Sequence, residues 1–142
     1  MRELKIDERG FPIPFFVPII HGKPEFRFQD ERKLKLCIGK KLCSICGKKL
    51  YDKSFWFISG PMGLKNHTAS DAPMHEACAR FSIAVCPHLV YQRADRRDQL
   101  PIEGTVRTNP HMIHEKPNDI FLMKADKVEI LEAQNRIFLD FV

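Results

Sequence analysis

Two closely spaced pairs of metal-ligand side chains constrain this chain more than any other feature of its sequence. The first pair is Cys43 and Cys46, which is followed by Gly47, and the second pair is His75 and Cys78. Three thiols and one imidazole at these spacings suit the tetrahedral coordination of a zinc ion. We therefore predict that the four side chains bind one Zn2+ ion and tie two distant stretches of backbone together.

The residues around each pair indicate how the ligands are presented. A glycine after the first pair supplies the backbone freedom that a tight turn needs. His75 and Cys78 are three residues apart, which places them on one face if the segment is helical. We expect this helix to run to about Val85. Its start is indicated by Pro73, which fits a first turn, and by the candidate capping residues Ser70 and Asp71.

The stretch between the two pairs favours a strand followed by a turn. Tyr51 to Ile58 is aromatic and β-prone, and Ser59 to Gly63 has the composition of a turn. A zinc-bearing turn, a strand or hairpin and a helix with the last two ligands follow one another in treble-clef zinc modules, which Leu42 to about Cys86 resemble. Because four protein ligands fill the tetrahedron, we expect the metal to be structural and not catalytic.

The cysteines admit two other interpretations. A pair with two intervening residues also serves redox chemistry, but such a site normally follows a strand and opens a helix, whereas Gly47-Lys48-Lys49 indicates a turn. The four residues could also be ordinary buried cysteines and a hydrogen-bonded histidine. Five cysteines, an odd number, argue against a closed disulfide framework and fit a reducing compartment. Cys37 and Cys86 are left without an assigned role.

Length and composition favour a single domain over residues 1–142. Hydrophobic residues make up 44% of the chain and charged residues 29%, as in globular domains. We predict a small zinc-stabilised α+β domain with a treble-clef-like core, an N-terminal β-hairpin and additional C-terminal strands. Periodicity leaves residues 129–138 open between strand and helix. The expected segments are a hairpin over 11–29, a short helix over 30–39 capped by Asp30 and ended by Gly39, a zinc module over 42–90, a loop over 93–110 and strands within 111–142.

Several motifs together resemble a group of uncharacterised small proteins from bacterial and bacteriophage genomes. The motifs are Pro14-Phe15-Phe16, Gly22-Lys23-Pro24-x-Phe26-Arg27, Cys43-x-x-Cys46-Gly47, Gly60-Pro61-Met62, Pro73-x-His75-x-x-Cys78-Ala79 and Cys86-Pro87. The resemblance spans about Phe11 to Leu89 and implies that hairpin, zinc turn and helix form one unit, but it carries no established activity. The chain departs from this group at His88, where an aromatic residue is expected, and near its C-terminus.

Basic residues crowd around the predicted zinc turn. The net charge is +5, and eight basic residues between Arg32 and Lys53 face one acid, Asp52. Such a stripe could neutralise phosphates, while Tyr51, Phe55 or Trp56 could stack on unpaired bases. The lysines could equally form a solvated face that balances the zinc thiolates, and contacts that read bases favour arginine. The candidate nucleic-acid-binding residues are Lys33, Lys35, Lys40, Lys41, Lys48, Lys49 and Trp56.

An enzyme would need a second site, because the four zinc ligands leave no open coordination position. Cys86, His88, His111 and His114 could bind a second metal, with Glu115 as a base, in a metal-dependent hydrolase or nuclease. We favour the interpretation that His111 and His114 are exposed loop histidines and that Cys86 is a buried cysteine at a helix end. The sequence has no phosphate-binding glycine loop, nucleophile elbow or His-Glu-x-x-His helix.

The sequence thus predicts a non-catalytic zinc-stabilised recognition module, with a protein partner favoured over nucleic acid. The loop from Gly60 to Thr68 could be a recognition loop, although it could equally be a connection, and Trp56 could dock a partner. The start of the chain, Met1 to Arg9, is too charged for a secretory leader, and no apolar run reaches the length of a membrane span. We therefore expect a cytoplasmic protein.

Overall fold

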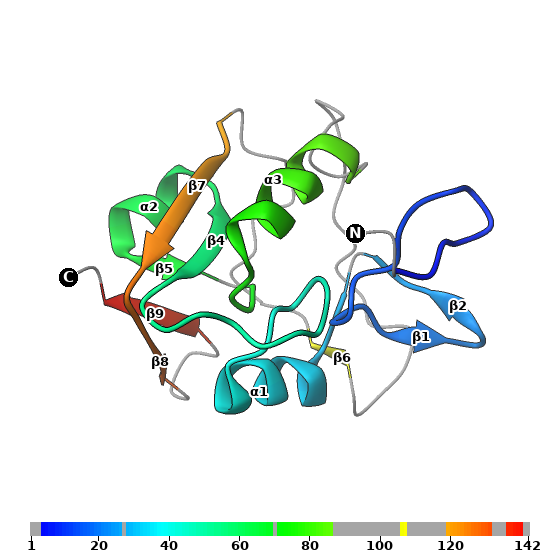
Figure 1. Cartoon of the computed structure of the whole chain (residues 1–142), viewed down its shortest axis with the longest axis horizontal. Helices are drawn as coiled ribbons and strands as arrows, with labels where there is room; N and C mark the ends of the chain where they lie inside the picture. Colours follow the sequence, from blue (N-terminus) through cyan, green and yellow to red (C-terminus); the bar gives the residue numbers. More distant parts are fainter. Residues whose placement is uncertain are drawn as a thin grey trace.

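The structure, a computed structural model, describes residues 4–26, 28–69, 71–86, 106–107, 119–131 and 136–140. Within these residues, three helices and a set of short strands form a small α+β fold (Figure 1). In chain order the elements are β1 Ile19–Ile20, β2 Lys23–Pro24, β3 Gln29–Asp30, α1 Glu31–Lys40, β4 Phe55–Ser59, α2 Pro61–Asn66, β5 Thr68–Ala69, α3 Glu76–Val85, β6 Val106–Arg107, β7 Phe121–Ala125, β8 Lys127–Leu131 and β9 Arg136–Asp140. None of the described helices has the length and apolar character needed to cross a membrane.

The predicted N-terminal hairpin is present as strands β1 and β2, at the side of the molecule away from β7 and β9 (Figure 1). Its strands are antiparallel, with Ile19 opposite Pro24, and the turn consists of His21 and Gly22, both at positive φ. The strands are shorter than the predicted range because proline cannot donate a ladder hydrogen bond. The hairpin is therefore only two residues long on each side.

Helix α1 begins at its predicted cap and ends later than predicted. The carboxylate of Asp30 accepts hydrogen bonds from the backbone N–H groups of Arg32 and Lys33 at 3.0 and 3.3 Å. The predicted stop at Gly39 is wrong, because the helix continues to Lys40. The chain leaves it at Lys41, which takes a left-handed conformation with φ of 53° and donates its N–H to the last carbonyls of the helix. A lysine there costs about 1–2 kcal/mol relative to glycine.

Strand β4 pairs with a partner from the far end of the chain. It runs antiparallel to β7 from Phe55 opposite Ala125 to Ser59 opposite Phe121. The sequence left open whether the aromatic segment forms a single strand or a hairpin. It forms a single strand, without a hairpin inside the zinc module. On its other edge, Trp56 exchanges two backbone hydrogen bonds with Met74, at 3.0 and 2.9 Å. This single bridge connects β4 to the residues just before α3.

The predicted turn and loop after β4 are in fact a short helix, α2. Gly60 occupies its N-cap position and Pro61 its first turn, where a missing N–H costs nothing. A Cβ on Gly63 would overlap the Ser59 hydroxyl and come within 2.7 Å of the Thr68 carbonyl oxygen. Only glycine permits this close approach of α2 to the chain that follows it. The loop interpretation was wrong because glycine and proline also suit a helix start.

Most of the described residues in 119–131 and 136–140 form strands, as predicted. Strand β8 pairs antiparallel with β9, which also pairs with β5, so the sheet order is β5-β9-β8. The helical alternative for 129–138 is wrong for the described residues at both ends of that range. Within the predicted loop 93–110, residues Val106–Arg107 form β6 and pair with β3. The rest of that loop and residues 111–118 lie outside the described residues.

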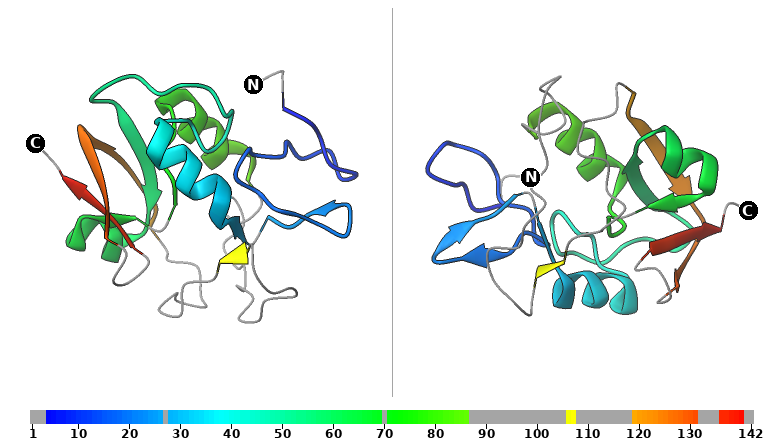
Figure 2. Two further views of the ribbon diagram at one scale, coloured as in Figure 1. Left: turned by 90° about the horizontal axis from the view of Figure 1, so that it is seen from below. Right: turned by 180° about the vertical axis from the view of Figure 1, so that it is seen from behind.

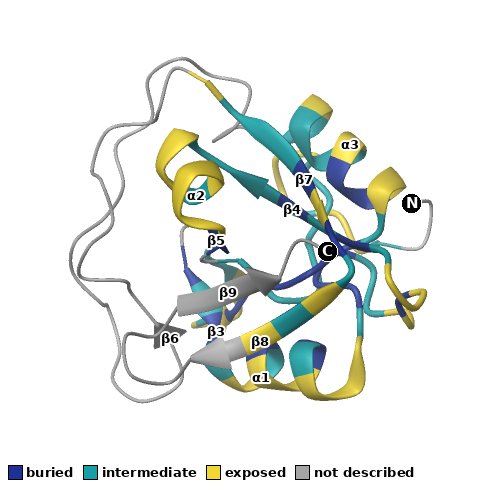
Figure 3. Ribbon diagram, turned by 90° about the vertical axis from the view of Figure 1, so that its left-hand side faces the viewer, coloured by how far each residue is buried: buried dark blue, intermediate teal, exposed yellow. Residues whose placement is uncertain are grey.

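The core lies between α1, α3 and the β4–β7 pair (Figure 3). Phe57, at the centre of β4, is 0% exposed, and Ala79 of α3 is also fully buried. Two of the predicted zinc ligands, Cys43 and Cys78, belong to this core and not to the surface. Figure 2 shows from two further sides how the segment between α1 and β4 passes the start of α3. The predicted metal site therefore lies at the edge of the core.

Candidate metal centre

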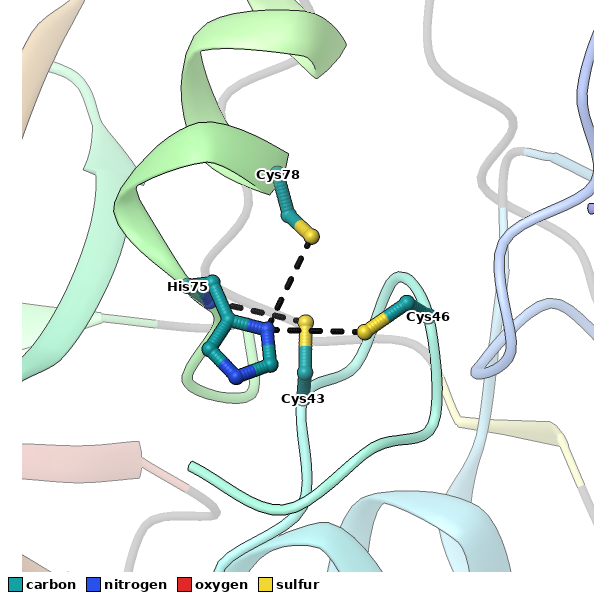
Figure 4. Close-up of side chains that lie close together, drawn as sticks. All are labelled: Cys43, Cys46, His75 and Cys78. Carbon is teal, nitrogen blue, oxygen red and sulfur yellow. Dashed lines mark hydrogen bonds between the residues drawn. The ribbon is translucent and has the colours of Figure 1, made fainter. Parts of the chain in front are cut away.

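The structure brings the four predicted ligands together in one Cys3His cluster, Cys43, Cys46, His75 and Cys78 (Figure 4). One ligand atom from each residue lies within 4.8 Å of the others. Cys43 and Cys78 are buried, while Cys46 and His75 are half-buried and form the outer side. None of the cysteines is in a disulfide. The arrangement is one that could hold a single metal ion.

The first two ligands lie on a tight turn that the backbone closes by itself. The N–H of Cys43 donates to the carbonyl of Lys48 at 2.7 Å, and the N–H of Gly47 donates back to Cys43 at 2.8 Å. Gly47 has a φ of 73°, so the backbone freedom inferred from the sequence is required here. The turn follows helix α1 and does not open a helix, which argues against a redox pair.

Replacing Gly47 by alanine is expected to destabilise the protein by about 2–3 kcal/mol. The left-handed backbone accounts for part of this cost, and a new Cβ 3.1 Å from the Phe15 ring accounts for the rest. Gly22→Ala is the matched control, because Gly22 has a φ of 76° but nothing within 4 Å of the new Cβ. Denaturant unfolding should show a larger loss for Gly47→Ala. Equal losses would mean that the Phe15 contact contributes nothing.

Two other segments hold the turn in place through hydrogen bonds to their backbone. The N–H groups of Phe15 and Phe16 donate to the carbonyls of Ile45 and Ser44 at 2.8 and 3.0 Å. On the opposite side, the N–H of Ser44 donates to the carbonyl of Pro73 at 2.9 Å, two residues before His75. The Ser44 hydroxyl is also buried and donates to Ala72. The N-terminal segment, the turn and the approach to α3 are thus directly connected.

His75 stands at the N-cap position of α3, one residue before the helix begins. The predicted capping is wrong: no side chain caps this helix, and Asp71 accepts a hydrogen bond from Gln29 instead. Ser70 lies outside the described residues. The half-buried imidazole of His75 instead turns toward the thiols, and its backbone N–H donates to the sulphur of Cys43 at 3.5 Å. The helix start therefore presents a ligand where a cap was expected.

A backbone carbonyl fixes which nitrogen of His75 faces the cluster. The Nε2 atom lies 2.9 Å from the Lys49 carbonyl oxygen, which can only accept, so Nε2 carries the proton. In the neutral ring, Nδ1 then presents its lone pair to the thiols. Histidines that bind metals usually donate their second N–H in this way. The sequence offered no signal for this contact, because the acceptor belongs to the backbone of the first turn.

Two nitrogen–sulphur distances within the cluster are close to the edge length of a zinc tetrahedron. With Zn–S bonds of about 2.3 Å and Zn–N bonds of about 2.0–2.1 Å, a nitrogen and a sulphur ligand should lie about 3.5 Å apart. Nδ1 of His75 lies 3.4 Å from Cys46 Sγ and 3.8 Å from Cys78 Sγ. The side chains thus fit one four-coordinate ion.

The electrostatics of the cluster point to a cation. Burial, followed by the neighbouring thiols of Cys43 and Cys46, raises the pKa of Cys78. Burial also raises the pKa of Cys43, although backbone N–H groups, first that of Cys46, favour its thiolate. Three adjacent thiols, two of them buried, cannot all ionise without positive charge among them. A divalent ion would supply that charge and convert them to thiolates.

The remaining two cysteines lie outside the cluster. Cys37 on α1 is 0% exposed, and burial, together with the nearby Cys43, raises its pKa to about 12 despite Lys33. Cys86 is half-buried and caps the C-terminal end of α3. His88, His111, His114 and Glu115, the other members of the predicted second metal site, lie outside the described residues. Among the described residues, no second group of metal-ligating side chains occurs.

Cysteine alkylation at about pH 8 should distinguish these environments. In the metal-loaded protein we expect rapid modification of Cys86 alone, because the cluster thiols are coordinated and Cys37 is buried with a pKa of about 12. Mass spectrometry of the digested protein gives the modified positions. After chelation and unfolding, all five cysteines should react. Rapid modification of Cys37 in the folded protein would contradict the burial described above.

Three of the predicted nucleic-acid-binding lysines interact with neighbouring groups of the protein. Lys35 pairs with Glu31 at 3.1 Å, and Lys41 pairs with Asp52 at 2.9 Å. Lys33 donates to a backbone carbonyl and lies over the Phe15 ring. The other three predicted lysines, Lys40, Lys48 and Lys49, are exposed.

The aromatic residues of this region differ in their availability for stacking. Phe55 is buried in the core, so the prediction that it could stack on bases is wrong. Trp56 packs against the core, and its Nε1–H donates to Ser54. Tyr51 is 74% exposed, and its ring lies 5.5 Å from that of His75. An aromatic surface therefore exists next to the cluster, at Tyr51 and not at Trp56.

Comparisons of the chain with protein families, with curated proteins and with solved structures gave no match. The resemblance to small bacterial and bacteriophage proteins stays a prediction. The function is therefore inferred from the cluster and the surfaces described here.

Proposed function

We propose that the protein is a non-catalytic recognition module whose fold is stabilised by one Zn2+ ion bound to Cys43, Cys46, His75 and Cys78. The observation that carries this proposal is the cluster itself, in which one ligand atom from each of four residues lies within 4.8 Å of the others and His75 Nδ1 lies 3.4 and 3.8 Å from two of the sulphurs. With all four positions filled by protein, the metal has no site for water or substrate. Its role is to hold the first turn against the start of α3.

The order of elements supports a treble-clef-like core. A metal-bearing turn, strand β4 and helix α3 follow one another, and the last two ligands lie at the start of that helix. The second arm of the usual hairpin is reduced to the bridge between Trp56 and Met74. β4 obtains its full pairing from β7 instead. The zinc module is therefore completed by the C-terminal strands.

The exposed apolar side chains of the surface are best explained by binding to a protein partner. Several large apolar side chains are exposed, among them Tyr51 at 74%, Met62 at 56% and Leu64 at 40%. Exposed apolar and aromatic groups are typical of protein-binding surfaces. The basic stripe offers less to nucleic acid than its sequence indicated, because Lys35 and Lys41 are paired with acids.

Nucleic acid is the second candidate, favoured by one observation. Exposed Tyr51 lies within three residues of the exposed Lys48, Lys49 and Lys53 in the sequence and could stack on an unpaired base. A salt titration with single-stranded and duplex oligonucleotides tests it. Binding that weakens steeply with salt supports this candidate, and no binding at low salt removes it.

Metal analysis of the purified protein tests the main proposal. We expect one zinc ion per chain, and we expect Cys46→Ser to abolish it while Cys86→Ser retains it. A protein without bound metal would overturn the zinc-stabilised module. Two ions per chain together with hydrolysis of phosphodiesters would instead favour the metal-dependent hydrolase or nuclease.

A further inference from the structure

The segment that follows the first turn, residues 49–51, contacts the His75 ring from outside the cluster. The Lys49 carbonyl oxygen lies 2.9 Å from Nε2 of His75, on the side of the ring that faces away from the thiols (Figure 4). The Tyr51 ring lies 5.5 Å from the imidazole, at an interplanar angle of 55°. This separation is within the range of about 4.5–7 Å that is typical of interacting aromatic pairs. The imidazole is therefore held at two points by one short segment.

The segment itself is firmly anchored. Two backbone hydrogen bonds, of 2.7 and 2.8 Å, join residues 43 and 41 to the residues on either side of Lys49. Neighbouring residues of an antiparallel ladder direct their backbone polar groups to opposite sides, so the Lys49 carbonyl points away from this pairing and toward His75. The side chain of Leu50 is 4% exposed and belongs to the core. The two groups that contact the imidazole are thus carried by a fixed piece of backbone.

His75 is the ligand that a competitor from the solvent displaces most easily. Departure of a thiolate from the ion separates opposite charges, whereas departure of a neutral imidazole does not. The ring is also half-buried at the outer side of the cluster, while Cys43 and Cys78 are buried. Cys46 shares the outer side but is bound as a thiolate. The rate at which the ion is lost therefore depends on how firmly the imidazole is held.

We propose that Tyr51 is a positioning residue of the metal centre, whose ring keeps the His75 imidazole on the ion and so slows the exchange of zinc with the solvent. The inference rests on the zinc-binding part of the proposed function and adds a residue that is not itself a ligand. The hydrogen bond to Lys49 fixes the direction of Nδ1, but a single hydrogen bond lets the ring tilt. Contact with the Tyr51 ring restricts that tilt, which gives a local reason for an aromatic side chain that is 74% exposed.

The rate of zinc release tests this role. The zinc-loaded protein is mixed with an excess of the chromogenic chelator 4-(2-pyridylazo)resorcinol, and the absorbance of the zinc complex is followed. We expect Tyr51→Ala to accelerate release about two- to tenfold, the usual strength of an aromatic pair, because the contact is lost when the imidazole leaves. Tyr51→Phe keeps the ring and should release zinc at the unsubstituted rate. The control is Met62→Ala, which removes an exposed side chain from α2 and should also leave the rate unchanged.

A His75→Cys background shows whether Tyr51 acts through the imidazole. With a fourth thiolate in place of the imidazole, Tyr51 has nothing to position, so Tyr51→Ala should no longer change the release rate. Equal acceleration in both backgrounds would show a general loosening of the turn and would overturn the proposal. The comparison of Tyr51→Ala with Tyr51→Phe needs no altered ligand, and it decides the question if His75→Cys does not fold.

The outcomes separate this inference from the zinc module itself. Release from Tyr51→Ala at the unsubstituted rate would overturn the role of Tyr51 and leave the module standing, because both proteins would still carry one zinc ion. Equal acceleration by Tyr51→Ala and Tyr51→Phe would assign the effect to the hydroxyl group and would likewise overturn the role of the ring. A purified protein without bound metal would instead remove the module, and this inference with it.

Discussion

Removal of the metal is expected to unfold the protein. Cys43 and Cys78 are part of the hydrophobic core, so an empty cluster would leave polar thiols without a cation among Leu34, Phe57 and their neighbours. Structural zinc contributes about 10–16 kcal/mol to folding in small domains, whereas the net stability of a domain is about 5–15 kcal/mol. Circular dichroism should therefore show loss of structure and of the thermal transition when a strong chelator is added, and recovery with Zn2+.

Substitution of a single ligand separates this effect from side effects of the chelator. Cys78→Ser removes one ligand from the start of α3 and should prevent cooperative folding even with excess zinc. Cys86→Ser is the same chemical change near the other end of α3, outside the cluster, and should leave the thermal transition in place. A Cys78→Ser protein that melts like the unsubstituted one would show that the core holds the fold without metal.

The second large effect is expected at the centre of β4. Phe57 is 0% exposed, and its backbone lies opposite Met123 of β7. Phe57→Ala would leave a cavity between the β4–β7 pair and the rest of the core, which should cost about 3–5 kcal/mol. Denaturant unfolding of the zinc-loaded protein gives this loss directly. Because the cluster is formed by other segments, the substituted protein should still bind one zinc ion.

Two further substitutions test whether the loss comes from the cavity. Phe57→Leu keeps most of the buried volume and should cost clearly less than Phe57→Ala. Ile19→Ala also removes apolar side-chain atoms, about half as many as Phe57→Ala, from a residue that is 55% exposed, and it should change stability by less than about 0.5 kcal/mol. Similar losses for Phe57→Ala and Ile19→Ala would mean that β4 is not a core strand.

The features predicted correctly from the sequence depend on neighbouring residues. The spacing of Cys43 and Cys46 and the glycine after them describe a turn that closes within itself. Asp30 caps α1 through the N–H groups of the next residues, which is also a local contact. The two ligand pairs could be assigned to the same ion because together they supply four soft ligands, the number that tetrahedral zinc needs. The cluster could therefore be predicted from the chain alone.

The features that were missed depend on distant partners or on backbone atoms. Nothing in the sequence near Phe55 indicates that its strand pairs with Ala125, because β propensity does not specify a partner. Gly60 and Pro61 fit both a turn and a helix start, and the close packing at Gly63 decides for α2. His75 was expected inside a helix that in fact begins one residue later. The contact from its ring to the Lys49 carbonyl could not be predicted, because every residue has a backbone carbonyl and the residue type gives no signal.

The pairing of β4 with β7 has a consequence for the protein during its synthesis. All four metal ligands leave the ribosome before residue 79, but the strand that covers β4 begins at residue 121. At about 5–20 residues per second, the metal-binding part therefore waits a few seconds for its partner. During that time Phe55 to Ile58 offers an apolar, β-prone edge to other nascent chains. We expect a polypeptide truncated before β7 to retain the four zinc ligands and to bind chaperones through the exposed strand β4.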